Sequence, residues 1–239
     1  NYGVQRENHS DTHITLNINL NNKNIITLQE YISLFGIANS MDGIANDSDF
    51  KCISVNHVIK LIYDLTICLN TLKDLELSIL KINVNDFHVV IPNTIYHKAI
   101  NKNILPDDII SYINDIVFIY TGSVSNHLYP LQDKDKIHIE TPIEFSNIND
   151  YLSPEIISFN KNNKTLPHNF NIKTSYYIIA LFIIDLLFGT TTQDKSDPMS
   201  LMSSEKLLTL LEPLYYTKLY YFLLRCLQPN INDRYFLFV

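Results

Sequence analysis

The sequence predicts an α+β fold that is predominantly α-helical. Two observations support this prediction: long stretches repeat apolar residues at helical spacing, and a few shorter pieces have the pattern of strands. With 239 residues, the chain is long enough to bury a substantial core. Its content of 46% hydrophobic and 18% charged residues excludes a disordered or low-complexity chain.

The N-terminal part of the chain predicts one strand and one short helix. Residues 12–20 alternate polar and apolar side chains, which is typical of a half-buried strand. A capping box then runs from Thr27 to Glu30 and opens a short helix that Gly36 can close. The small and polar residues 38–50 predict a loop.

A long amphipathic helix is predicted from a Ser54 cap to about Leu75. Its apolar residues recur three or four positions apart, so they define one buried face. These residues are Val58, Leu61, Ile62, Leu65, Leu69 and Leu72.

Two short pieces of strand are predicted in the middle of the chain, at 88–91 and 116–120. The polar stretch 92–108 separates them. Residues 121–152 predict an extended and mostly irregular segment, and Pro154 lies on the approach to the next helix.

The most hydrophobic run, Tyr176 to Phe188, predicts a buried helix over 174–188. Thirteen residues that include Asp185 are too few to cross a bilayer, so we expect a core helix and no transmembrane segment. Four of its side chains are expected to be almost inaccessible to water: Ile179, Leu181, Ile183 and Leu186. The elements expected after it are a loop at 189–202 and helices at about 203–211 and 215–227.

Charge and cysteine content restrict the function classes. The formal charge is 18 − 25 = −7, so the chain lacks the basic surface that binds phosphate backbones, and we expect no nucleic-acid partner. The cysteines at 52, 68 and 226 form no Cys-x-x-Cys pair, which argues against a zinc knuckle or a disulfide scaffold. We therefore expect the cytoplasm or another reducing intracellular compartment. No metal-binding or hydrolase motif is present, and we expect no cofactor.

The chain also carries signs of its origin. Abundant Ile and Asn, with no Trp, are typical of a protein encoded by an AT-rich genome. It begins at Asn1 without Met, and it shows no secretory signal. We expect it to be a piece of a longer protein.

Four segments of the chain stand out by their order and spacing. They are ILKINVNDFHVVI at 79–91, SPE at 153–155, SYYIIALFIIDLLFG at 175–189 and LYYFLLRCLQPNINDR at 219–234. Together they resemble the catalytic loop, the Ala-Pro-Glu motif, the central helix and the last helices of the helical C-lobe of a eukaryotic protein kinase. The resemblance implies a kinase-like helical lobe over 25–239, with at most a remnant of the N-lobe strands in 1–24.

The resemblance places noncatalytic side chains in the catalytic loop. Lys81 falls at the His position of His-Arg-Asp, Asn83 at the Asp position and His88 at the metal-binding Asn position. An amide cannot act as a carboxylate base, and Mg²⁺ prefers oxygen to an imidazole. The loop is therefore expected to be degenerate.

The position of the metal-binding Asp of Asp-Phe-Gly has two alternatives. Asp115 holds it if the preceding strand is SYIN, and Tyr120 holds it, followed by Thr-Gly122, if that strand is IVFIY. The sequence slightly favours Asp115 as a remnant of the metal site.

Ser175 replaces the Asp that opens the central helix, and it is a sound N-cap. No Gly-rich phosphate loop and no strand with the phosphate-binding Lys is found in the chain.

One structural feature follows from the resemblance. It implies a buried ion pair between Glu155 and Arg234, which ties the end of the activation segment to the last helices. The alternative is that both side chains are solvated separately.

The leading interpretation is a catalytically inactive, kinase-like (pseudokinase) domain. It would act as a protein-interaction or regulatory scaffold in a larger assembly, with a protein partner and without ATP binding by this chain. A divergent active kinase, with its small lobe outside this chain, is the first alternative. An unrelated helical scaffold is the second.

Overall fold

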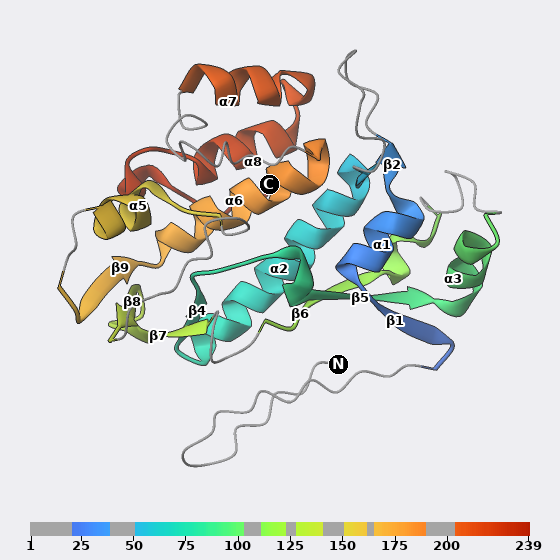
Figure 1. Ribbon diagram of the computed structural model, residues 1–239, viewed down its shortest axis with the longest axis horizontal. Helices are drawn as coiled ribbons and strands as arrows, with labels where there is room; N and C mark the ends of the chain where they lie inside the picture. The colour runs from blue at the N-terminus through green and yellow to red at the C-terminus, as the bar shows by residue number, and fades with distance from the viewer. Residues whose placement is uncertain are drawn as a thin grey trace.

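A computed structural model describes most of the chain and shows a mixed α+β fold (Figure 1). The described residues are 21–38, 51–102, 111–122, 128–140, 151–161, 165–189 and 204–239. The helices are α1 Leu28–Phe35, α2 Val55–Asp74, α3 Asn93–Ile100, α5 Pro154–Lys161, α6 Lys173–Phe188, α7 Ser204–Leu211 and α8 Lys218–Cys226. The strands are β1 Lys23–Thr27, β2 Ile37–Ala38, β3 Lys51–Cys52, β4 Leu77–Ile79, β5 Phe87–Pro92, β6 Val117–Tyr120, β7 Leu128–Gln132, β8 Lys136–Ile139 and β9 His168–Asn171.

The strands pair in small antiparallel sheets. β5 lies between β1 and β6, the order of the larger sheet is β4-β7-β8-β9, and β2 pairs with β3. In the three-stranded sheet, Phe87 lies opposite Tyr120 and His88 lies opposite Ile119. Because β4 and β5 belong to different sheets, the connection between them, which carries Asn83, links the two larger sheets.

Helix α6 confirms the expected core helix and lies against α2 and α8 (Figure 1). Ile179 and Ile183 are fully buried and Leu186 is almost so, but the prediction for Leu181 is wrong because it is only partly buried. Leu181 and Asp185 lie one helical turn apart, on a partly exposed stripe of a helix whose other sides are covered. None of the described helices combines the length and apolar composition needed to cross a membrane.

The predicted start and end of the first helix are confirmed. Thr27 Oγ1 accepts a hydrogen bond from Glu30 N at 3.1 Å, and Gly36 N donates to Ile32 O at 2.8 Å at the other end of α1. A Cβ at Gly36 would lie 2.6 Å from Lys51 Cβ, so the close approach of β3 excludes a side chain here.

Helix α2 matches the predicted amphipathic helix in extent and in most of its buried face. Leu69 is the exception, because it is only partly buried. Ser54 occupies the N-cap position, but its side chain makes no capping bond to the backbone. Its Oγ instead lies 3.3 Å from His57 Nδ1.

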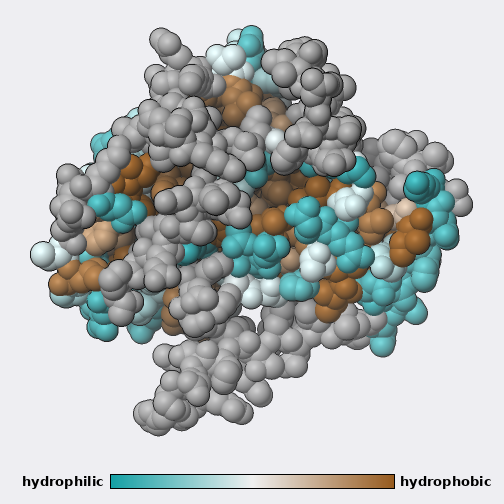
Figure 2. Space-filling view, viewed as in Figure 1, coloured by the Kyte–Doolittle hydropathy of each residue, from teal (hydrophilic) through white to brown (hydrophobic). Residues whose placement is uncertain are grey.

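On the face shown in Figure 2, hydrophobic and hydrophilic side chains are interspersed over the middle of the molecule.

The structure contains more strand and helix than the sequence predicts between 92 and 171. The strands β5 and β6 are confirmed, but α3 lies in the stretch expected to be merely polar. Likewise β7 and β8 lie in the segment expected to be mostly irregular, and α5 begins at Pro154. Pairing with β4 and β9 stabilises β7 and β8, and this nonlocal contact leaves no local pattern.

Some expectations fall wholly or largely outside the described residues, and one concerns the start of the last helix. The strand at 12–20 and nearly all of the loops at 38–50 and 189–202 lie outside the described residues. Of the segment 1–24, only its end is described, and it begins β1, which pairs with β5. The last helix is shorter than predicted because Thr217, and not a residue near 215, is its N-cap: Thr217 Oγ1 accepts from Tyr220 N at 3.1 Å.

Candidate functional site

The connection from β4 to β5 carries Asn83, and β5 carries His88, the two residues that the kinase resemblance places in a catalytic loop. Asn83 begins the short 3₁₀ helix η1, Val84–Asp86, and its Oδ1 accepts a hydrogen bond from Asn85 N at 2.8 Å. In return, the buried Asp86 accepts from Asn83 N through Oδ2 at 2.8 Å. This reciprocal capping occupies the Asn83 side chain with local structure, since an Asn followed by a carboxylate three residues later favours such a turn.

His88 contacts a residue that follows β6. Its Nδ1 lies 2.9 Å from Thr121 Oγ1, and Thr121 N donates to Asp86 O at 2.6 Å. The antiparallel register of β5 and β6 positions these groups, because Tyr120 lies opposite Phe87 and the chain then passes Asp86. His88, the residue that the resemblance places at the metal-binding Asn position, therefore contacts the residue that directly follows β6.

The two alternatives for the metal-binding Asp depend on which segment forms the preceding strand. Residues 111–115 are helical, and β6, Val117–Tyr120, covers most of IVFIY, so the strand that the Tyr120 alternative requires is present and the one that the Asp115 alternative requires is not. Asp115 ends the 3₁₀ helix η2, Ile113–Asp115, and its side chain is exposed at the opposite end of β6 from Thr121.

Tyr120 offers no carboxylate at this position. Its ring packs edge-on against Phe87, with centroids 5.4 Å apart, and its hydroxyl donates to Lys81 O at 3.5 Å. Burial, and after it the Asp86 carboxylate, raise the pKa of Tyr120 well above its usual value, so the phenol stays neutral. Within the described ranges, no group of three or more His, Cys, Asp or Glu side chains could hold a metal ion.

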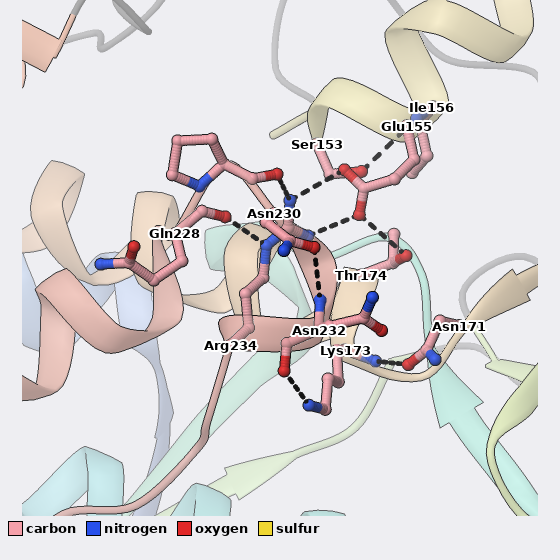
Figure 3. A network of polar contacts seen from close by, with 11 residues as sticks. Ser153, Glu155, Ile156, Asn171, Lys173, Thr174, Gln228, Asn230, Asn232 and Arg234 are labelled. Atoms are coloured by element: carbon pink, nitrogen blue, oxygen red, sulfur yellow. Dashed lines mark hydrogen bonds and ion pairs between the residues drawn. The ribbon is translucent and has the colours of Figure 1, made fainter.

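The expected ion pair between Glu155 and Arg234 is present and bidentate (Figure 3). Arg234 Nη1 and Nη2 lie 2.5 and 3.1 Å from the Glu155 carboxylate oxygens. The Arg234 side chain is completely buried, whereas 22% of the Glu155 side chain is exposed. The pair joins the start of α5 to the chain after the 3₁₀ helix η5, Ile231–Asp233.

Further groups contact the Arg234 guanidinium. Arg234 Nε donates to Gln228 O at 2.7 Å and Nη2 to Pro229 O at 3.2 Å. The guanidinium also lies over the Tyr177 ring of α6, 4.7 Å from its centroid. Thr174 Oγ1 donates to Glu155 Oε1 at 3.2 Å, so α6 contacts both charged groups. A buried charge with this many partners fixes the relative positions of α5, α6 and the end of α8.

Ser175 connects α6 to β4, although the prediction that it caps the helix is wrong. The helix begins two residues earlier at Lys173, whose N–H donates to Asn171 Oδ1 at 2.9 Å, so Ser175 is not the N-cap. Its buried hydroxyl donates instead to Ile79 O and lies 3.1 Å from Ser78 Oγ. A neutral hydrogen bond thus links α6 to the end of β4, immediately before the connection that carries Asn83.

A second contact to α6 was not predicted. Tyr151 donates to Asp185 Oδ2 at 2.6 Å, which ties the residue two positions before Ser153 to the partly exposed stripe of α6. Burial raises the pKa of Asp185, and the bond from Tyr151 partly offsets this rise. A charged residue inside an apolar run was the one signal in the sequence for this contact, since such a residue needs a partner. Thr121 gave no comparable signal.

No protein-family model matches the sequence, and no curated protein matches it. The functional proposal therefore rests on the geometry of two groups of residues. One surrounds Asn83 and His88, and the other surrounds the ion pair of Glu155 and Arg234.

Proposed function

We propose that residues 25–239 form a kinase-like helical lobe that performs no phosphoryl transfer and serves as a protein-interaction or regulatory scaffold in a larger assembly. The observation that carries the proposal is the buried, bidentate ion pair of Glu155 and Arg234. These residues are 79 positions apart, and the kinase-like resemblance gives a specific reason for their contact.

The order of the other elements supports the same assignment. The long helix α2 leads through β4 to the loop that carries Asn83, and this loop leads into β5. The buried helix α6 bonds to the backbone of β4 through Ser175, the residue at the position of the kinase-like Asp. A neutral hydroxyl keeps the connection between helix and loop but provides less stabilisation than a carboxylate would.

The chemistry of the loop argues against catalysis. Phosphoryl transfer on such a lobe needs a carboxylate to orient the substrate hydroxyl and oxygen ligands for Mg²⁺. Here Asn83 caps a turn, His88 contacts Thr121, and the Tyr120 hydroxyl bonds to a backbone carbonyl. Each of the three groups contributes to structure, and none is a carboxylate. The proposal therefore includes no cofactor and no ATP binding by this chain.

The proposed partner is a protein. A net charge of −7 disfavours nucleic acid, because binding a phosphate backbone requires a concentration of positive charge. Cys52, Cys68 and Cys226 are free thiols, which suits the reducing intracellular compartment that the proposal assigns.

A phosphoryl-transfer assay tests the proposal. The longest native form of the protein is incubated with Mg²⁺ and labelled ATP beside the double variant Asn83→Asp, His88→Asn. We expect no transfer from either protein, because catalytic groups act as a unit and the metal position at Tyr120 remains without a carboxylate. Metal-dependent labelling by the native protein that disappears in His88→Ala would support the alternative of a divergent active kinase. The exposed Asp115→Ala serves as the matched control, and it should change nothing.

A further inference from the structure

The segment Tyr235–Val239 has no regular secondary structure and packs against α2, α6 and α8, and the C mark in Figure 1 shows where it ends. Phe236 packs against Tyr176 of α6, with ring centroids 5.4 Å apart. Phe236 and Phe238 both contact Phe222 of α8, at 5.1 and 5.6 Å. Every second side chain of the segment is therefore anchored on the core.

The alternate side chains of the segment face the solvent. Tyr235, Leu237 and Val239 are each more than half exposed, as the period of two in an extended chain requires. Tyr235 N donates to Arg225 O at 3.4 Å, but residues 236–239 make no backbone hydrogen bond to any described residue. An anchored, extended backbone with unpaired N–H and C=O groups is a template for the addition of another strand.

Two side chains of α2 extend this apolar surface. Tyr63 contacts Phe238 edge-on at 5.6 Å, and Ile67 lies one helical turn further along. Their exposed fractions are 53% and 54%, comparable to those of the outward side chains of the segment. We call the five exposed residues Tyr63, Ile67, Tyr235, Leu237 and Val239 the tail strip. Side chains of this size, each about half exposed, offer on the order of 500 Å² in one copy, so two copies reach about the 1,000 Å² of a specific interface.

The composition of the segment favours a second copy of this chain as the occupant. The residues Tyr-Phe-Leu-Phe-Val have high β-propensity and include no charge and no Pro, which is typical of strands that pair with their own kind. In an antiparallel pair about a twofold axis, the same aromatic and branched side chains meet across the strands, and the interface closes as a dimer. Although each chain carries a net charge of −7, the five residues of the tail strip are uncharged, and a cation lies beside them: Lys173 Nζ is 4.5 Å from the centroid of the Tyr235 ring.

We propose that the tail strip is a self-association surface, on which Tyr235–Val239 pairs antiparallel with the same segment of a second copy. This inference does not depend on the kinase-like assignment. It predicts a dimer that is weak at low salt and tightens as salt screens the repulsion between the two acidic chains.

Sedimentation equilibrium of the 239-residue chain from about 1 to about 500 µM tests the proposal, since an interface of this size is expected to give a dissociation constant in the micromolar range. Leu237→Lys should weaken the dimer at least about tenfold. Ile100→Lys at the end of α3 is the matched control, since Ile100 is 50% exposed and lies outside the tail strip, and it should leave the dimer unchanged. Val239→Lys replaces Leu237→Lys if thermal unfolding shows that the latter does not fold.

Two results would overturn the proposal. One is a chain that remains monomeric at every concentration, which would assign the strip to a strand of a different protein. The other is a dimer that Leu237→Lys and Ile100→Lys weaken equally, which would place the interface elsewhere.

Discussion

Replacing Glu155 by Gln tests how much the ion pair with Arg234 stabilises the fold. The change keeps the size of the side chain but removes the charge that neutralises a completely buried guanidinium. Breaking a buried pair in this way costs about 3–5 kcal/mol when no other partner remains. Arg234 retains two backbone carbonyls and the Tyr177 ring, and part of Glu155 is exposed, so we expect a smaller loss of about 2–3 kcal/mol.

Urea unfolding followed by circular dichroism measures this free energy, with the midpoint falling and the slope unchanged. The double variant Glu155→Gln, Arg234→Met should cost less than the sum of the two single variants by more than about 1 kcal/mol, because the groups are directly coupled. Asp133→Asn is the matched control, since it removes an exposed ion pair with Lys136 and should not change stability measurably. A loss below about 0.5 kcal/mol in Glu155→Gln would refute the reasoning, because it would show that the pair is solvated.

Two further variants test contacts made by other buried polar groups. Burial lowers the pKa of His57 to about 4, below its usual value near 6.5, so stability should be complete above pH 6.5 and fall by up to about 3 kcal/mol as the pH drops toward 4. His57→Gln should flatten this part of the stability–pH profile, and an unchanged profile would contradict the assignment. Ser175→Ala should cost about 1–3 kcal/mol, because Ile79 O loses its donor; no loss in urea unfolding would show that this bond contributes nothing.

Local patterns in the sequence predicted the elements whose stability depends on local contacts. The capping box at Thr27 and the apolar periodicity of α2 are properties of neighbouring residues, so both could be recognised without the fold. The apolar run of α6 was equally clear, but which of its sides is partly exposed depends on the packing of other segments, and Leu181 was misplaced for that reason.

Nonlocal pairing limited the rest of the prediction. The hairpin of β7 and β8 forms between β4 and β9, and neither partner strand was recognised. The choice between Asp115 and Tyr120 depended on where β6 begins, which is fixed by pairing with β5. The ion pair of Glu155 and Arg234 was anticipated through a family resemblance, because no spacing rule connects residues so far apart.

The Mg²⁺ dependence of ATP binding tests most directly the proposal that this chain has no catalytic metal site. Calorimetric titration of the longest native form of the protein compares ATP affinity in Mg²⁺ with that in EDTA. The account predicts no difference, because His88 contacts Thr121 and Tyr120 offers no carboxylate. An affinity that rises about tenfold or more with Mg²⁺, and loses this gain in His88→Ala, would contradict it.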